Sequence, residues 1–385
     1  MEDPFEKYMT RREFLRVAAL LSLQVWVLTS FTGCLLSRPP TSPVPSTEDI
    51  GEASYYSQLQ QSNVLCELCF RRCTISEGDR GFCLARENRY GKLYTLTYGK
   101  PVAVHIDPVE KEPMFHMEPG SDTLCLGTAS CNFRCKFCIN WQIAWKAPDE
   151  VEAVPMTPAE VVQAAIDHDV PTICFTYNDP IQQYEFMSDI ARLGKEKGLK
   201  TTFHSNGSIN PEPLKALLPY MDSVAIDLKG FDPEVYRQLT EGELEPVLNT
   251  LRTIKEEGVW LEVVCLLVPG WNDNMDDIRR MCTWIKQNLG EETVVHFSRF
   301  FPTCKLTKLP PTPLSTLEQA HDIAREVGLH YVYIGNVSGH DYANTYCPKC
   351  GKILIKRKGL LIQENNIVNG KCTFCGHEIP GLWGK

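Results

Sequence analysis

Three cysteines in one short segment, Cys131, Cys135 and Cys138, constrain this chain more than any other feature. Three and then two residues separate them, so one loop supplies three thiolates, the ligands that hold iron in iron–sulfur clusters. Such a set binds three irons of a [4Fe–4S] cluster and leaves the fourth iron open to an external chelating group. The segment therefore predicts a cluster that takes part in chemistry. The alternative is a zinc site in which Cys125 supplies the fourth ligand of a closed tetrahedron.

Residues 119–340 show the alternation expected of an α/β domain. Short β-branched or apolar runs alternate with segments of helical length, and Thr157 and Glu160 form a capping box around Pro158. A second box of this kind is expected at residues 315–318. Strands separated by helices pair in parallel, which predicts a partial or full (β/α) barrel. The predicted strands are residues 123–126, 172–176, 200–204, 223–227, 259–267, 293–297 and 330–334.

Polar residues follow these strands, at the end where such barrels place their chemistry. We expect Asp179 and its neighbours to bind an ammonium group, and Asp227 and Lys229 to bind hydroxyl or carboxylate groups. The alternatives are a turn at Asp179 before Pro180 and a simple salt bridge between Asp227 and Lys229. Phe137 is expected to shield the cluster or to flank an adenine ring. The predicted cofactor-binding residues are Phe137, Tyr177, Asn178, Asp179, Asn206, Asp227 and Lys229.

Eight further cysteines form two sets of four, and four thiolates can close a tetrahedron around one metal ion. The first set belongs to an N-terminal cysteine-rich module, residues 52–118, and is compatible with structural zinc or with a second iron–sulfur cluster, of which we favour zinc. The second belongs to a C-terminal module, residues 341–385, whose paired CxxC segments predict a zinc ribbon, with rubredoxin-like iron as the alternative. The sets are Cys66, Cys69, Cys73 and Cys83, and Cys347, Cys350, Cys372 and Cys375.

The N-terminal 36 residues resemble a twin-arginine export signal. Arg11 and Arg12 precede an apolar stretch that runs to residue 36, and Cys34 lies in a context similar to a lipoprotein processing site. Residues 37–51 are rich in Pro, Ser and Thr and predict an extended linker. We therefore expect export or membrane association, with a cytoplasmic protein as the alternative. The formal net charge of -9 argues against nucleic acid as a partner.

Five segments resemble the radical SAM component of the AmmeMemoRadiSam group, which is itself similar to activating enzymes of pyruvate formate-lyase. Asp179 stands where this family tends to have glutamate. The segments are residues 73–83 (CTISEGDRGFC), 108–116 (PVEKEPMFH), 131–138 (CNFRCKFC), 175–180 (FTYNDP) and 344–350 (NTYCPKC).

The resemblance implies a partial (β/α)6-type radical SAM barrel with a [4Fe–4S] cluster on Cys131, Cys135 and Cys138 and S-adenosylmethionine (SAM) as co-substrate. It further implies an external low-potential electron donor, reductive cleavage of SAM, and hydrogen abstraction from a protein or small molecule. Activation of a glycyl radical enzyme is one alternative. The other is a non-catalytic iron–sulfur or zinc protein, although stable electron carriers bind their irons with four protein ligands, not three.

Overall fold

The computed structural model describes residues 51–384. The predicted export signal, residues 1–36, and all of the linker except Gly51 lie outside the described residues, so export and membrane attachment remain predictions. Within residues 51–384, no helix combines the length and the apolar character that a membrane crossing needs.

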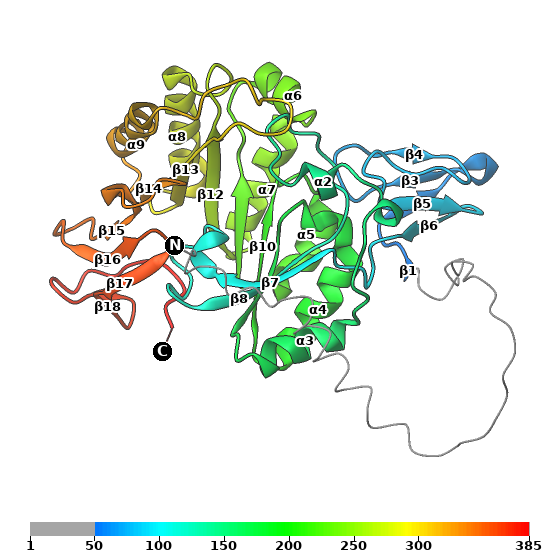
Figure 1. Ribbon diagram of the computed structural model, residues 1–385, viewed down its shortest axis with the longest axis horizontal. Coiled ribbons are helices and arrows are strands. Elements are labelled where there is room, and N and C mark those ends of the chain that lie inside the picture. The colour runs from blue at the N-terminus through cyan, green and yellow to red at the C-terminus, as the bar shows by residue number, and fades with distance from the viewer. Residues whose placement is uncertain (1–50, 385) are drawn as a thin grey trace, which may run out of the picture.

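A sheet of eight strands lies at the centre of the protein, in the order β14-β13-β12-β11-β10-β9-β8-β7 (Figure 1). Strands β8 to β14 are parallel, and β7 runs antiparallel to β8 at the edge. The two edge strands do not pair, so the barrel is open and the predicted α/β fold is confirmed. The strands are β7 (Ala103–Pro108), β8 (Asp122–Gly127), β9 (Thr172–Phe175), β10 (Lys200–Ser205), β11 (Ser223–Asp227), β12 (Trp260–Leu267), β13 (Val294–Arg299) and β14 (Val332–Gly335).

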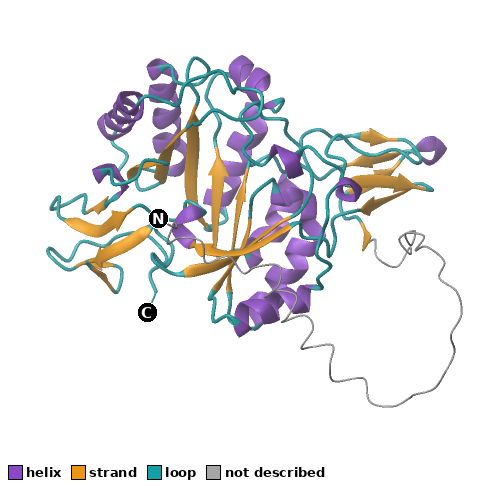
Figure 2. Cartoon of the chain, viewed as in Figure 1, coloured by secondary structure: helices purple, strands orange, loops and turns teal. Residues whose placement is uncertain are grey.

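Helices connect the parallel strands and cover one face of the sheet (Figure 2). The capping box at α3 forms as predicted: the amide of Glu160 donates to Thr157 Oγ1 at 3.2 Å, and the amide of Thr157 donates to Glu160 Oε2 at 2.7 Å. The second predicted box is wrong, because α9 already begins at Leu314, after Pro313, and no side chain caps it. The helices are α2 (Trp141–Ala144), α3 (Pro158–Asp167), α4 (Tyr184–Glu196), α5 (Pro211–Leu217), α6 (Pro233–Thr240), α7 (Leu244–Glu256), α8 (Met275–Leu289) and α9 (Leu314–Val327).

The segment between β7 and β8 covers part of the opposite, concave face of the sheet. Val109, Met114 and Met117 from this segment form a buried cluster with Ala225 of β11 and Val264 of β12. Side chains of this one segment therefore fill part of the barrel interior, and the carboxyl ends of the strands remain the place for a site.

Two small modules of strands lie at opposite ends of the central sheet (Figure 1). Each contains one of the four-cysteine sets. The N-terminal module consists of β1 (Gly51–Glu52), β2 (Tyr56–Gln58), β3 (Val64–Cys66), β4 (Thr74–Ile75), β5 (Arg86–Arg89) and β6 (Lys92–Thr95). The C-terminal module consists of β15 (Thr345–Tyr346), β16 (Ile353–Lys358), β17 (Leu361–Asn365), β18 (Ile367–Val368) and β19 (Lys371–Cys372).

Candidate functional site

The three-cysteine loop follows β8 and is fixed by backbone contacts to the end of α6. The amide of Arg134 donates to Thr240 O, and that of Lys136 donates to Leu239 O, both at 2.9 Å. The ring of Phe133 lies so close to Gly242 that a Cβ atom there would come within 2.3 Å of the ring. Only glycine at position 242 permits this approach, so the loop position depends on a residue far away in the sequence.

The three thiols are arranged for a group larger than a single ion. Within residues 51–384, they are absent from the groups whose ligand atoms all lie within 4.8 Å of one another. Burial raises the pKa of Cys135 and of Cys138 to about 12, so free thiolates are disfavoured until a metal binds them. Three thiols on one loop, too far apart for one ion, fit the [4Fe–4S] cluster that the motif predicts.

Buried polar atoms without a partner surround this loop. Ser130 Oγ, Ser208 Oγ and Asn178 Oδ1 have no hydrogen-bond partner among the described residues. Buried polar groups in native proteins usually have a hydrogen-bond partner. These three atoms are therefore free to contact a group bound beside Cys131.

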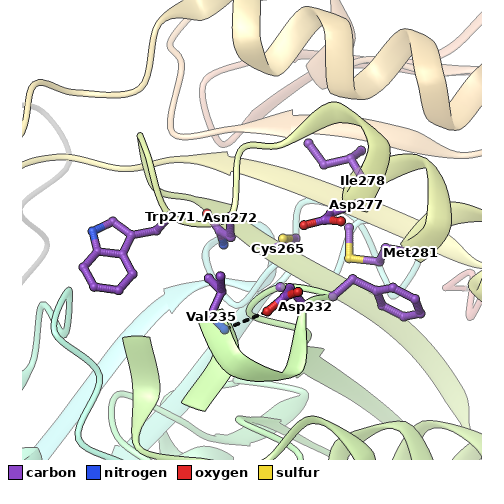
Figure 3. A pocket seen from close by; sticks show the side chains of 10 residues that line it. Asp232, Val235, Cys265, Trp271, Asn272, Asp277, Ile278 and Met281 are labelled. Atoms are coloured by element: carbon purple, nitrogen blue, oxygen red, sulfur yellow. Dashed lines mark hydrogen bonds between the residues drawn. The ribbon is translucent and has the colours of Figure 1, made fainter. Parts of the chain in front are cut away.

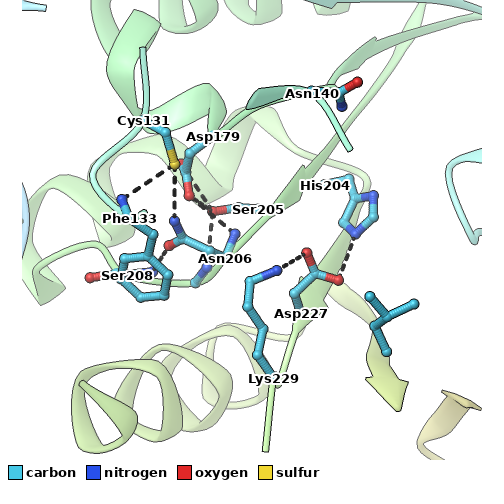
Figure 4. Close-up of polar contacts among 12 residues, drawn as sticks. Cys131, Phe133, Asn140, Asp179, His204, Ser205, Asn206, Ser208, Asp227 and Lys229 are labelled. Carbon is cyan, nitrogen blue, oxygen red and sulfur yellow. Dashed lines mark hydrogen bonds and ion pairs between the residues drawn. The ribbon is translucent and has the colours of Figure 1, made fainter. Parts of the chain in front are cut away.

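Asp179 and Asn206 form one polar group with the loop (Figure 4). The carboxylate of Asp179 accepts from the amide of Ile181 at 3.0 Å and from that of Asn206 at 3.1 Å, and Ser205 Oγ donates to it at 3.2 Å. Burial nevertheless raises the pKa of Asp179 to about 6. Asn206 Nδ2 lies 3.8 Å from Cys131 Sγ. Asp179 thus connects the segment after β9 to the end of β10 behind the cysteine loop. Its hydrogen bond from the amide of Ile181 is the turn role that was the alternative for this residue.

Asp227 and Lys229 form a second polar group at the end of β11 (Figure 4). Lys229 Nζ lies 2.7 Å from Asp227 Oδ2, and His204 Nε2 lies 3.1 Å from Asp227 Oδ1. Burial opposes ionisation of Asp227, but Lys229 and His204 outweigh it and hold its pKa well below the usual range. Lys229 Nζ also lies 5.5 Å from the centre of the Phe137 ring. The predicted residues Asp227, Lys229 and Phe137 therefore come together as one charged and aromatic edge.

Tyr177 and Asn178 have different surroundings from each other. The hydroxyl of Tyr177 donates to Asp107 Oδ2 of β7 at 3.1 Å, so this side chain lies against the edge strand and not against the cysteine loop. Asn178 Nδ2 donates to the backbone oxygens of Thr128 and Ser130, directly before Cys131. Asn178 is the one of the two that supports the loop.

Cys125 lies in β8, opposite Cys174 of β9 in the strand register. With Glu112, these two thiols form a buried group whose ligand atoms all lie within 4.8 Å of one another. Cys125 is therefore grouped with Cys174 and Glu112, and not with the three-cysteine loop. This arrangement disfavours the zinc alternative at the loop.

The C-terminal cysteines form a compact set. The sulfur atoms of Cys347 and Cys375 lie 3.6 Å apart, and those of Cys350 and Cys372 lie 3.8 Å apart. Zinc–sulfur bonds of about 2.3 Å in a tetrahedron place sulfur atoms about 3.8 Å apart. The donor set therefore fits one tetrahedral ion, as a zinc ribbon requires. The N-terminal cysteines line a cavity instead.

A separate hollow lies between α6 and α8 (Figure 3). Its lining includes Asp232, Cys265, Asn272 and Met281, and it is shallow and partly open to solvent. Asp232 accepts from the amide of Val235 at 2.9 Å and so caps α6. None of the three loop cysteines lines this hollow, so we assign it no part in the chemistry.

Several residues of the site received no role from the sequence. Asn132, His204 and Ser205 contact the predicted residues directly. Asn132 was visible inside the cysteine motif, and His204 and Ser205 were visible at the carboxyl end of a predicted strand, where they are the last residues of β10. Arg86 and Gln182, which line the cavity of the N-terminal cysteines, carry no motif that could have revealed them.

Comparisons with known proteins identify the family of this chain. The model of the Radical SAM superfamily matches residues 126–282. An uncharacterized protein of Methanocaldococcus jannaschii is 45% identical over 85% of this chain and 98% of its own length. The pyruvate formate-lyase-activating enzyme of Clostridium pasteurianum is 25% identical over 43% of this chain and 69% of its own length. A radical SAM methyltransferase structure from Sphaerobacter thermophilus has a TM-score of 0.46 and 17% identity, covering 62% of this chain and 71% of that one. The chain belongs to the radical SAM superfamily.

Proposed function

We propose that this protein cleaves SAM reductively to methionine and a 5′-deoxyadenosyl radical, which then abstracts hydrogen from a protein or small-molecule substrate. The observation that carries this proposal is the loop with three thiols at the carboxyl ends of the strands. Cys125, the cysteine nearest to this loop in the sequence, is grouped with Glu112 and Cys174 and so is not a fourth ligand. The family implies a [4Fe–4S] cluster on Cys131, Cys135 and Cys138, and such a cluster supplies the single electron that breaks a carbon–sulfur bond of SAM.

The side chains around the loop are suited to hold SAM in place. Asn178 Oδ1 is buried, without a partner, and can accept a hydrogen bond from the ammonium group of SAM. The Asp227–Lys229 pair offers an acceptor and a donor for ribose hydroxyls or for the carboxylate, beside the Phe137 ring. Asn206 orients Cys131 through its amide nitrogen. Asp179 acts indirectly, because it positions Asn206.

Within the superfamily, we assign the chain to the radical SAM component of the AmmeMemoRadiSam group, on the five segments that carry the resemblance. An external low-potential protein supplies the electron. The test is anaerobic incubation of the full chain with SAM and dithionite, followed by chromatography. We expect 5′-deoxyadenosine and methionine in equal amounts, and neither without reductant. Reduced, iron-loaded protein that leaves SAM intact would refute the proposal.

A second candidate is activation of a glycyl radical enzyme, which the likeness to the pyruvate formate-lyase-activating enzyme favours. In this case the hydrogen comes from a backbone glycine of a protein partner. Electron paramagnetic resonance of the chain mixed with such a partner, SAM and reductant would show a glycyl radical doublet. Absence of the doublet, with 5′-deoxyadenosine still formed, would favour a different substrate.

A further inference from the structure

We propose that Cys66, Cys69, Cys73 and Cys83 bind a second [4Fe–4S] cluster, which relays electrons to the three-cysteine loop. The metal site stands on the geometry of the N-terminal module alone. The relay rests on the proposed function, because it needs the loop to carry the cluster that reduces SAM.

The spacing of the sulfur atoms distinguishes this set from the C-terminal zinc set. In residues 51–384, the C-terminal cysteines gather within 4.8 Å of one another, whereas no three of the N-terminal cysteines do. The three-cysteine loop shows the same wider spacing. A cube of iron and sulfide holds its ligand sulfurs at roughly 6 Å, against about 3.8 Å around one zinc ion. The N-terminal set therefore follows the cluster pattern.

The four cysteines also line one common pocket. The pocket is partly open to solvent, and Arg86, Asn132 and Gln182 line it as well. The inorganic part of a cubic cluster lies between its four thiolates, which is where this pocket lies.

Two buried side chains in the wall of this cavity have unused hydrogen-bond donors. Arg86 is 1% exposed; its Nη1 pairs with Glu185 at 2.7 Å, but Nε and Nη2 have no partner among the described residues. Gln182 is 2% exposed, and its Nε2 is likewise without a partner. Both residues line the cavity together with the four cysteines. An iron–sulfur cluster with four thiolate ligands is an anion whose sulfur atoms accept N–H hydrogen bonds, so it satisfies these donors.

The cavity shares a wall with the three-cysteine loop. Asn132, the residue after Cys131, lines the cavity. Arg71, another lining residue, donates from Nε to Asn132 O at 2.7 Å. One electron from an external low-potential donor protein passes through this site to the loop, where it enters the sulfonium of SAM. One carbon–sulfur bond then breaks homolytically, and methionine and the 5′-deoxyadenosyl radical are the products.

The decisive experiment removes the loop ligands and counts metals in the full chain. The variant Cys131→Ala/Cys135→Ala/Cys138→Ala, purified anaerobically, should keep about four iron and about four sulfide per chain. After reduction, it should show the electron paramagnetic resonance signal of a [4Fe–4S] cluster. Wild-type protein should carry about twice as much of each. A triple variant that contains zinc but no iron and sulfide would overturn the second cluster. If wild-type protein then still cleaves SAM, the proposed function survives that failure.

The relay has a separate test in the variant Cys69→Ser/Cys83→Ser. We compare SAM cleavage driven by a reduced flavodoxin-class protein with cleavage driven by dithionite, which is small enough to reduce the loop directly. The ratio of the two rates should fall at least about 10-fold relative to wild type. An unchanged ratio would overturn the relay. As a control, Cys282→Ala changes a cysteine of α8 that belongs to none of the proposed sites and should leave this ratio unchanged.

Discussion

The two four-cysteine modules have the same number of thiols but different surroundings. In the C-terminal module the sulfur atoms approach to 3.6 and 3.8 Å, as a single tetrahedral ion requires. In the N-terminal module the thiols surround a cavity, with unpaired donors from Arg86 and Gln182 in its wall. The number of cysteines therefore does not decide whether a single ion or a cluster binds. The distances between the sulfur atoms and the hydrogen-bond donors around them decide it.

The modules also differ in how they are attached to the barrel. Arg357 of the C-terminal module is buried; it donates to Phe115 O at 2.9 Å and lies 4.0 Å from Glu110. Arg71 of the N-terminal module is only partly buried and donates to backbone oxygens of Asn132 and Glu241. The N-terminal module is also joined to α4 by the buried ion pair of Arg86 with Glu185, and Val64 and Leu93 belong to the main core of the barrel. We therefore expect both modules to affect the stability of the whole chain, and the contact made by Arg357 to contribute more than the contact made by Arg71.

Removal of one C-terminal thiol should have the largest effect. Cys350 is exposed, so Cys350→Ala removes a metal ligand with little loss of packing. We expect complete loss of zinc, unfolding of the C-terminal module, and a loss of several kcal/mol for the chain, because zinc binding and folding are coupled. Zinc analysis and urea unfolding measure both effects. The control, Phe374→Ala, changes an exposed neighbour and should retain zinc; loss of iron with full zinc in Cys350→Ala would contradict the assignment.

The next largest effect should come from Arg357→Met. This change leaves the buried Glu110 without its cation, and breaking a buried pair costs about 3 to 5 kcal/mol. Burial already raises the pKa of Glu110 to about 7. Protonation of Glu110 should therefore keep the loss of unfolding free energy at about 3 kcal/mol. Urea unfolding gives the free energy of unfolding. The adjacent Lys356→Met breaks only an exposed pair with Glu364, and an equal loss in both variants would contradict the attachment through Arg357.

Acid should weaken the junction between the C-terminal module and the barrel. The expected loss of unfolding free energy is smaller than that of Arg357→Met and larger than that of Arg71→Met. Burial lowers the pKa of His116 to about 4, and its ring bonds to Tyr333 and to Pro380 O. The unfolded chain binds a proton at this histidine near pH 6.5, whereas the folded chain does not until near pH 4, so stability falls as the pH falls through this window. We expect a loss of about 2 kcal/mol between pH 6.5 and pH 5.

The variant His116→Gln tests this pH dependence. Its free energy of unfolding should change less between pH 6.5 and pH 5 than that of the wild type, since the titrating group is absent. His168→Gln, at an exposed position, should keep the wild-type slope. Equal slopes in wild type and His116→Gln would assign the acid sensitivity to other groups.

The smallest effect should come from Arg71→Met at the N-terminal module. The change removes hydrogen bonds to two backbone oxygens, and each such bond contributes about 1 kcal/mol. Limited proteolysis should show faster cleavage within residues 52–100 and little change in the barrel. Arg72→Met, which breaks an exposed pair with Glu67, is the matched control. A loss as large as that of Arg357→Met would contradict the difference in attachment.

The sequence predicted the strands of the barrel because they are buried on both faces and appear as short apolar runs, such as β9 (Thr172–Phe175). It did not predict β7 (Ala103–Pro108), whose residues are all half-buried and polar in part, as is common for an edge strand. Pro313 and Leu314 set the start of α9 one residue before the expected capping box.

The site was predictable where chemistry depends on a local pattern and hidden where it depends on tertiary contacts. The spacing of Cys131, Cys135 and Cys138 is visible in the sequence, and so are the polar residues after each strand. The contact of Gly242 with Phe133 and the unpaired donors of Arg86 arise only when distant segments pack together. Tyr177 shows the same limit, since its position after a strand does not reveal that its side chain lies toward β7.

The central claim is that the three-cysteine loop carries the group that cleaves SAM, and 5′-deoxyadenosine formation by Cys135→Ala tests it most directly. Loss of one of three thiolates should remove or destabilise the loop cluster, so the product should disappear while circular dichroism shows a folded barrel. Cys174→Ala, within β9, should cost modest stability and retain product formation. Wild-type levels of 5′-deoxyadenosine from Cys135→Ala would contradict the account.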